Sequence, residues 1–480
     1  MHKKVLTPII LTLLLASCSN KVSSTTSNNS QSNLSNNVSS TFSNNEQSYS
    51  SNNGVSSSII EDTKTLAPKV EIETTDSWAL MRSPYDMNVV LNPLLQPFWN
   101  TREVYNETFM FIGEEGEAEL LYEPGELICV QDYRFISLYE EGKDFIINGN
   151  KIKRTKNSNM PYVEASDYWV LEEDKKLETA DNIVFQDVVA DAEGPKKYGL
   201  EGKRFLKTRE NILSEFYQCV ISYKHDKPFP SDGFYPQSNG ISNFINKLKN
   251  EKKASIVFYG DSITEGWTAS GHLWEWSIEP HMHSWVRMVE SYLEKKYDAS
   301  IDVINEAKGG WTTNDGLSNY DIKMNGSIPH KHATEEIERS HDKLNPDLLV
   351  LGFGMNDWLL SRDLYRSMIA QMVAKYYEDN PNGNVILISS MPGHLDTEIN
   401  GNQKYFEEDL KLVAHNYEGT YVAPVYSMYD QFFKMGKHSK DVLSNNINHP
   451  NDFGVRTYAQ VFLKTLLGKE YIDESIKVNK

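Results

Sequence analysis

The chain has 480 residues, of which 39% are hydrophobic and 24% are charged, so most of it can bury a core. Asp and Glu number 67 against 48 Lys and Arg, and the formal net charge is −19. This balance disfavours a nucleic-acid binder, because binding phosphates requires clustered Lys and Arg. Three cysteines are too few for a disulfide scaffold or for a metal site built from four cysteines. The length predicts two domains with additional segments.

Residues 1–18 have the pattern of a signal peptide. A short positive region, His2–Lys4, precedes the apolar run Val5–Leu15, which is too short to span a bilayer. The segment Leu15–Cys18 resembles the bacterial lipobox, whose cysteine carries acyl chains after cleavage. We therefore expect lipidation at Cys18 and a protein anchored by lipid to the extracellular face of the cell membrane.

Residues 19–66 are predicted to be a disordered linker. Between Ser19 and Ile60, 26 of 42 residues are Ser or Asn, with almost nothing to bury. A stretch of this composition acts as a flexible spacer.

Residues 67–226 are predicted to form a β-sandwich domain, because short apolar runs alternate with turn residues. Phe145–Ile147 and Lys151–Lys153 flank Asn148-Gly149, which is typical of a tight hairpin. Phe216–Tyr223 has the pattern of a further strand. Two roles remain open for this domain: a packing or spacer unit, or a module that binds carbohydrate or shapes the substrate site.

Two cysteines, Cys129 and Cys219, lie in this predicted β domain. An oxidising compartment permits a disulfide between them, and two buried thiols are the alternative.

Residues 227–240 are rich in Pro, Gly and Ser and are predicted to connect the β domain to an α/β domain at 241–480. There, short apolar runs alternate with helical stretches such as Trp285–Lys296 and Asp363–Tyr377. This alternation predicts a doubly wound parallel sheet with helices on both faces and a ligand site beyond the carboxyl ends of the strands. The expected strands are 255–259, 301–304, 347–352, 384–388 and 421–425.

Four polar blocks follow strands or precede the last helix of this domain. They are Gly260–Gly266 with Ser262 at a strand-to-helix turn, Asn305–Gly310, Gly352–Asp357 and Asn446–Asn451. Glycines allow the backbone to approach a substrate closely, and an amide side chain can donate to a developing negative charge. The last block supplies an imidazole, which can activate a serine hydroxyl.

In this order, the four blocks resemble the SGNH (GDSL-type) esterase superfamily over about residues 255–467. The resemblance implies Ser262 as the nucleophile and His449 as its general base. It also implies an oxyanion hole formed by the backbone N–H of Ser262, the backbone N–H of Gly310 and the side-chain amide of Asn356. Family spacing favours Gly310 over Gly309. We expect neither a cofactor nor a metal.

One position departs from the family pattern. The family has Asp three residues before the histidine, and this chain has Asn446. A neutral amide orients an imidazole without stabilising the imidazolium as a carboxylate does. We expect a Ser-His dyad in which Asn446 or a main-chain carbonyl orients His449. The alternatives are that Asp441 or Asp452 replaces the missing acid, or that the domain is a weakened or inactive relative.

Three tryptophans suggest the substrate class. Trp267, Trp311 and Trp358 each follow one of the blocks directly, so they are predicted to line one mouth, where indole rings stack on sugars. Packing in the core is the competing interpretation of each ring.

The order of anchor, β domain and esterase domain is similar to that of the second carbohydrate esterase family. By this analogy we expect hydrolysis of short acyl esters, above all acetyl esters, on a polysaccharide. The alternatives are a lipase or thioesterase acting on longer acyl chains and a non-catalytic surface lipoprotein that binds glycans.

Overall fold

The computed structural model describes residues 94–175, 183–209, 214–230, 238–267, 269–271, 278–325, 330–331, 338–339 and 343–471. The predicted signal peptide, Cys18 and the linker lie outside these residues. Thr65–Lys480 form one compact unit. Every helix in the described part of the chain is too short or too polar to cross a bilayer.

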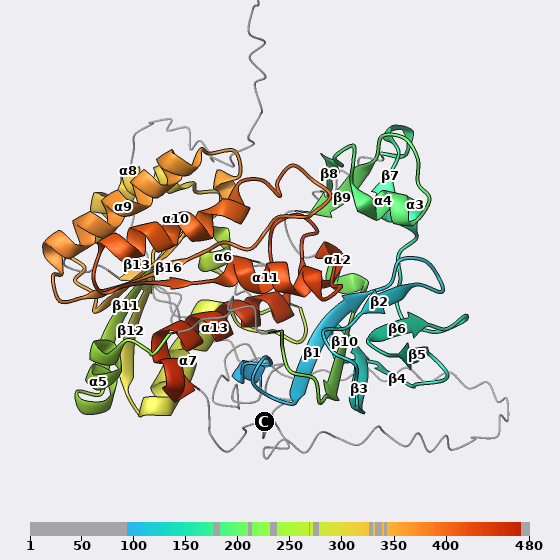
Figure 1. Cartoon of the computed structure of the whole chain (residues 1–480), viewed down its shortest axis with the longest axis horizontal. Helices are drawn as coiled ribbons and strands as arrows, with labels where there is room; N and C mark the ends of the chain where they lie inside the picture. The colour runs from blue at the N-terminus through green and yellow to red at the C-terminus, as the bar shows by residue number, and fades with distance from the viewer. Residues whose placement is uncertain are drawn as a thin grey trace, which may run out of the picture. The chain divides into compact units, whose positions relative to one another are not determined.

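The α/β block contains a five-stranded parallel sheet with the strand order β12-β11-β15-β16-β17 (Figure 1). All five predicted strands are confirmed. Their bounds are β11 Lys253–Gly260, β12 Ser300–Asn305, β15 Leu348–Gly352, β16 Asn384–Ile388 and β17 Thr420–Ala423. Every residue of β15 and β16 is buried, as expected for central strands that are covered on both faces.

Alternate strand residues face two different layers of helices. Ile256 and Phe258 of β11 belong to one apolar cluster, together with residues of α7 and α13. Val257 and Tyr259 belong to a second cluster with residues of α8, α9 and α10. The period of two along the strand therefore produces the three-layer arrangement seen in Figure 1. The helices are α5 Ser242–Asn250, α7 Trp285–Tyr297, α8 Thr313–Met324, α9 Arg362–Asp379, α10 Gln403–Asn416, α11 Val425–Lys434 and α13 Asp452–Leu467.

Shorter elements complete this block. They are α6 Ser262–Glu265, α12 Ser439–Val442, the β13–β14 pair His330–Lys331 and Glu338–Arg339, and the 3-10 turns Met355–Asp357 and Gly468–Tyr471.

The N-terminal block contains three antiparallel sheets, which confirms the predicted β-rich region. The first has the order β1-β10-β3-β4, with β1 Glu103–Met110, β10 Gln218–Lys224, β3 Glu126–Asp132 and β4 Leu138–Tyr139. The second has β2 Glu117–Glu119, β6 Lys151–Arg154 and β5 Phe145–Asn148, and the third has β7 Trp169–Val170, β9 Phe205–Arg209 and β8 Ile183–Asp187. The helical turns are α3 Ala165–Tyr168, α4 Glu193–Lys197, Glu172–Asp174 and Ser214–Phe216.

The predicted hairpin is confirmed with a shifted turn. Asn148 pairs with Lys151, so the two turn residues are Gly149 and Asn150, and Gly149 has a φ of 61°. The strand predicted from Phe216 begins instead at Gln218, because residues Ser214–Phe216 form a 3-10 turn.

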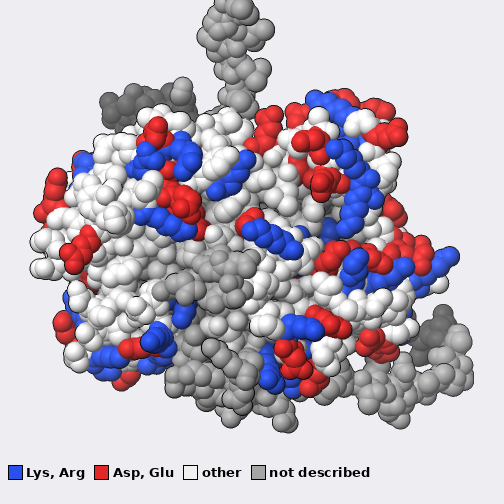
Figure 2. Space-filling model, viewed as in Figure 1, with Lys and Arg blue, Asp and Glu red and all other residues white. Residues whose placement is uncertain are grey.

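The two blocks share one apolar core. The largest cluster contains Val104 and Ile221 from the N-terminal sheets, and Val286 and Leu463 from helices of the α/β block. Cys129 and Cys219 are free thiols, so the disulfide alternative is not formed. Figure 2 shows Lys and Arg interspersed with Asp and Glu over the visible face of the molecule.

Candidate active site

Ser262 is the first residue of α6 and lies directly beyond the carboxyl end of β11. The side chain of Asp261 caps this helix by accepting a hydrogen bond from the backbone N–H of Ile263 at 3.1 Å. Because the strand and the capped turn fix the backbone on both sides, the Ser262 hydroxyl has a defined position at the edge of the sheet.

His449 contacts this hydroxyl. Ser262 Oγ and His449 Nε2 are 2.7 Å apart, although 187 residues separate them in the sequence. Both side chains are buried. Burial lowers the pKa of His449 to about 4, because the charged imidazolium loses its hydration. The imidazole is therefore neutral near pH 7, as a general base requires.

The residue that contacts the other ring nitrogen is Asn445. Its Nδ2 lies 3.1 Å from His449 Nδ1, and its Oδ1 accepts the backbone N–H groups of Ile447, Asn448 and His449 at 3.0–3.1 Å. These three donors fix the orientation of the amide, so its N–H group faces Nδ1. An N–H donor at Nδ1 favours the neutral tautomer that carries its proton on Nε2.

The prediction that Asn446 orients His449 is wrong. Asn446 Oδ1 accepts the hydroxyl of Tyr168 at 2.6 Å, and its Nδ2 donates to the carbonyl of Lys207 at 2.9 Å. The backbone of Asn446 has a φ of 62°, in the left-handed region that Asn tolerates better than most residues. In this conformation the amide of Asn446 bonds to the N-terminal block, and the amide of Asn445 contacts the imidazole.

Neither alternative acid contacts the imidazole. The Asp441 carboxylate pairs with Lys440 Nζ at 2.5 Å and accepts the backbone N–H of Met110 at 2.9 Å. Asp452 accepts the backbone N–H and hydroxyl of Ser270 at 2.9 and 2.6 Å. Across the described residues, the side chains within hydrogen-bond distance of the His449 ring are those of Ser262 and Asn445. The replacement of the missing acid by Asp441 or Asp452 is therefore excluded by this geometry.

The geometry of the third block is consistent with the oxyanion donors inferred from the resemblance. Asn356 Nδ2 donates one hydrogen to the carbonyl of Trp311 at 2.9 Å, which fixes the amide and leaves its second hydrogen for a ligand. The backbone N–H of Gly309 is used by Glu265 Oε2 at 2.6 Å. Gly310 has a φ of 78°, which suits glycine, and is exposed. Gly310 is therefore the better placed of the two glycines.

Two carboxyl groups that the sequence reasoning did not single out form hydrogen bonds next to the site. Asp261 accepts the backbone N–H of Met355 at 3.3 Å, and Asp357 accepts the hydroxyl of Thr313 at 2.8 Å. Burial raises the pKa of Asp261 to about 7 and that of Asp357 to about 6. Asp261 lies inside the block Gly260–Gly266 and Asp357 inside the block Gly352–Asp357. Their positions in these blocks could have marked them as site residues from the sequence.

The three tryptophans occupy different environments. Trp267 donates its indole N–H to Glu265 at 2.9 Å, and a Cβ atom added at Gly309 would lie 3.3 Å from Trp267 Nε1 and 3.8 Å from Ser262 Cβ. Trp267 is therefore close to the nucleophile. Trp311 packs edge-on against Tyr259, with the ring centroids 6.0 Å apart, as part of the second apolar cluster. The carbonyl of Trp358 accepts the backbone N–H of Asn402 at 2.9 Å.

The loop that carries His449, residues 443–451 (hereafter the His449 loop), is attached to the N-terminal block. Gln218 Nε2 donates to the carbonyl of Leu443 at 2.9 Å, and Asn451 Nδ2 donates to Gln218 Oε1 at 3.0 Å. The backbone N–H groups of Arg209 and Ser214 donate to the carbonyls of Asn445 and Ser444 at 3.2 and 2.7 Å. The catalytic histidine is therefore positioned by residues outside the α/β block.

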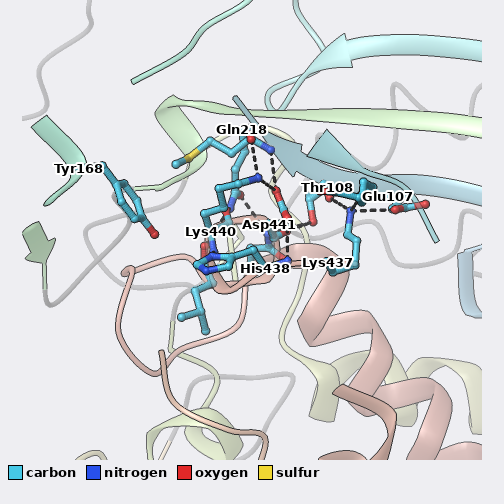
Figure 3. A network of polar contacts seen from close by, with 12 residues as sticks. Glu107, Thr108, Tyr168, Gln218, Lys437, His438, Lys440 and Asp441 are labelled. Carbon is cyan, nitrogen blue, oxygen red and sulfur yellow. Dashed lines mark hydrogen bonds and ion pairs between the residues drawn. The ribbon is translucent and has the colours of Figure 1, made fainter. Parts of the chain in front are cut away.

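Two buried lysines also bond the segment before the His449 loop to the N-terminal block (Figure 3). They are Lys440 in α12 and Lys437 in the preceding turn. Lys437 pairs with Glu107 of β1 at 2.8 Å, and both side chains are fully buried. Lys440 pairs with Asp441 and donates to the carbonyl of Met110 at 2.6 Å. Burial alone would raise the pKa of Asp441, but the ammonium groups of Lys440 and Lys437 lower it below its usual value.

The comparison with protein families matches the part of the chain that contains the four blocks. Residues 258–457 match the GDSL-like Lipase/Acylhydrolase family, which confirms the resemblance inferred from the four blocks. No curated protein sequence matches the chain at a significant level.

The comparison with solved structures matches an α/β-hydrolase from the metagenome of Lake Arreo, Spain. It is 18% identical, with a TM-score of 0.34 and coverage of 45% of this chain and 97% of that chain. An acetylxylan esterase from Geobacillus stearothermophilus is 16% identical, with a TM-score of 0.35 and coverage of 46% and 97%. The family match over residues 258–457 and the Ser262–His449 contact within them support a carboxylic ester hydrolase.

Proposed function

We propose that the protein is a serine esterase that cleaves short acyl esters, above all acetyl esters, on carbohydrate. The observation that carries this proposal is the 2.7 Å contact between Ser262 Oγ and His449 Nε2. A nucleophile within hydrogen-bond reach of a neutral imidazole is the arrangement that acyl transfer through a covalent intermediate requires.

The proposed reaction has two halves. Ser262 Oγ attacks the ester carbonyl carbon and passes its proton to His449 Nε2. His449 then returns that proton to the departing alcohol, which leaves an acyl group on Ser262. In the second half, water attacks the carbonyl carbon of the acyl group and gives its proton to His449. His449 returns this proton to Ser262 Oγ, and the carboxylic acid is released. The backbone N–H groups of Ser262 and Gly310 and the Asn356 amide would stabilise the oxyanion in both halves.

Because no carboxylate in the described part of the chain contacts its ring, His449 is a weak base. The productive tautomer carries its proton on Nδ1, where the ring N–H meets the Asn445 N–H group at 3.1 Å. Two donors facing one another disfavour that tautomer, and no described carboxylate stabilises the imidazolium. We therefore expect a dyad enzyme that is slower than a triad enzyme of the same fold.

The surroundings of Ser262 favour a short acyl group. The backbone at Gly309 packs tightly against this site, since a Cβ atom there would lie 3.1 Å from Glu265 Oε2 and 3.3 Å from Trp267 Nε1. The polar edge of the Trp267 indole next to the nucleophile suits an acetyl group better than a long alkyl chain.

The experiment is hydrolysis of p-nitrophenyl acetate, p-nitrophenyl palmitate and acetylated xylan by purified 67–480 and by its Ser262→Ala variant. We expect acetyl esters to be cleaved far faster than palmitate, and the variant to be inactive with an unchanged melting temperature. A preference for palmitate would favour the lipase or thioesterase alternative. Activity that survives in Ser262→Ala would remove Ser262 as the nucleophile, and no activity in either protein would favour a non-catalytic glycan-binding lipoprotein.

We also propose that Cys18 carries the lipid anchor and that the enzyme acts at the extracellular face of the cell membrane. The support is the sequence alone: the lipobox-like Leu15–Cys18 and the Ser/Asn-rich segment after it. Metabolic labelling with an alkyne fatty acid should modify the full-length protein. The Cys18→Ser variant should be unlabelled and should be absent from the membrane fraction.

A further inference from the structure

A cavity lies in the N-terminal block, next to the His449 loop. Its volume is about 570 Å³, within the range of small-ligand sites, and its lining includes Tyr162, Tyr168, Phe185, Tyr217 and Asn446. Asn446 lies on the His449 loop, and its neighbour Asn445 contacts the catalytic imidazole at 3.1 Å. The cavity and the catalytic base therefore share one loop.

Two of the aromatic rings that line the cavity are held in place. The guanidinium of Arg154 lies 4.5 Å from the centroid of the Tyr162 ring, and Arg154 itself is buried and bonded to the carbonyl of Met160 at 2.9 Å. The Tyr168 hydroxyl is fixed between Asn446 and His394 Nε2, at 2.6 and 2.9 Å. Rings that are already immobile lose little entropy when a ligand packs on them.

The polar part of the lining is acidic. Glu164, Asp167 and Asp174 line the cavity and are exposed, and Lys207 is the one basic residue among the described residues of the lining. Carboxylates accept hydrogen bonds from hydroxyl groups, whereas they repel a ligand that is itself anionic. A ligand that matches this cavity has apolar faces, many hydroxyl donors and no negative charge.

We propose that this cavity is a binding subsite for a neutral glycan. The subsite holds the polysaccharide chain next to the His449 loop. Sugar rings present C–H faces to aromatic side chains and hydroxyl groups to carboxylates, so they match both parts of the lining. The choice of a glycan rests on the proposed function. The location of the subsite and its selection against acidic chains are new.

The test measures binding without catalysis. Xylohexaose, cellohexaose and mannohexaose are titrated by calorimetry into the 67–480 protein carrying Ser262→Ala, with oligogalacturonate as the acidic comparison. We expect at least one neutral hexasaccharide to bind and oligogalacturonate not to bind. Adding Tyr217→Ala or Tyr162→Ala should weaken binding by about twofold to about tenfold for each lost ring.

Phe216 provides the matched control. It is an aromatic residue next to Tyr217 and is 49% exposed, and it does not belong to the cavity lining. Phe216→Ala should leave the affinity unchanged, and circular dichroism spectra should show that all variants fold. Equal affinity in the Tyr217→Ala, Tyr162→Ala and Phe216→Ala proteins would overturn the proposal, as would the absence of binding to every neutral hexasaccharide. Binding only to a cationic chain such as chitosan would reassign the cavity to polycations.

A kinetic readout connects the subsite to the ester reaction. In the active protein, Tyr217→Ala should lower kcat/KM for acetylated xylo-oligosaccharide relative to kcat/KM for p-nitrophenyl acetate, which contains no sugar. The two proposals fail separately. A protein that binds the glycan without hydrolysing p-nitrophenyl acetate would refute the esterase alone, and an active esterase with an unchanged ratio would refute the subsite alone.

Discussion

At the scale of single residues, Asn445 determines how well His449 works as a base. Its Oδ1 is bound by three backbone N–H groups, so the side chain presents N–H to His449 Nδ1. Asp at this position would keep those three bonds on one oxygen and turn the other oxygen toward Nδ1. The ring would then hold its proton on Nδ1 and leave Nε2 free to accept the Ser262 proton.

We therefore predict that Asn445→Asp raises kcat for p-nitrophenyl acetate at neutral pH by at least about tenfold, since exchanging the triad acid for an amide in serine proteases costs about 10⁴-fold. Asn446→Asp is the matched comparison, and it should give no gain because its amide bonds to Tyr168 and Lys207. A gain from Asn446→Asp with none from Asn445→Asp would restore Asn446 as the orienting residue.

The pH dependence tests the same imidazole. Burial lowers the pKa of His449 to about 4, and only the neutral ring is a base, so activity is present above this pKa and is lost as the pH falls through it. We predict that kcat/KM for phenyl acetate is half-maximal near pH 4 and flat toward neutral pH. Asn445→Asp should move the inflection upward, because a carboxylate favours the imidazolium. An inflection at or above about 6.5 in the unmodified protein would show that His449 is hydrated rather than buried.

The limit of sequence reasoning at this scale is visible in the same pair of residues. The blocks that carry Ser262, Asn356 and His449 could be found from the sequence because each directly follows a strand or precedes a helix. Counting three residues back from His449 pointed to Asn446, but the positive φ of that residue changes which amide contacts the ring. A backbone conformation of this kind depends on the partners of Asn446 in the N-terminal block, which are more than 200 residues away in the sequence.

At the scale of elements, the short helix α3 supports the His449 loop. Tyr168, its last residue, donates its hydroxyl to Asn446 Oδ1 at 2.6 Å and contacts His394 Nε2 at 2.9 Å. We predict that Tyr168→Phe lowers kcat for p-nitrophenyl acetate by about twofold to tenfold with little change in KM, as expected from the loss of one buried neutral hydrogen bond.

Tyr162→Phe is the control for that change, because it removes a hydroxyl from the same segment, and the aromatic ring that packs under Arg154 remains. It should leave kcat unchanged. Equal losses of kcat in the two variants would indicate that residues 162–168 as a whole have become less ordered. An unchanged kcat in Tyr168→Phe would show that the Tyr168 hydroxyl is not needed to hold the His449 loop.

The strands illustrate what could be predicted at the element scale. The five parallel strands are continuous apolar runs and were located within a few residues. The N-terminal strands range from two to eight residues. Their ends depend on pairing partners distant in the sequence, such as Cys219 of β10 opposite Asp132 of β3. Local patterns therefore predicted their presence and type better than their bounds.

At the scale of the whole molecule, the boundary predicted at residues 227–240 does not coincide with a break in the core. Phe229, inside that connection, is buried in the cluster that includes Val104 of β1 and Val461 of α13. The sequence pattern changes there because the type of sheet changes. Burial, which decides whether a segment folds independently, follows from contacts across the boundary.

The last prediction concerns removal of the N-terminal block. A chain of residues 241–480 retains Ser262, Asn356 and His449, but it loses β1, against which α12 and α13 pack. It also leaves Lys437 without Glu107, a buried pair in which removing one partner costs about 3–5 kcal/mol. A domain is stable by only about 5–15 kcal/mol, so this pair and the lost apolar contacts together exceed what the remaining sheet can tolerate.

We expect 241–480 to be insoluble or to show no cooperative thermal transition by differential scanning fluorimetry, whereas 67–480 unfolds cooperatively and is active. A folded 241–480 that hydrolyses p-nitrophenyl acetate as fast as 67–480 would show that the His449 loop keeps its geometry unaided, and that the N-terminal sheets serve the substrate rather than the catalytic base.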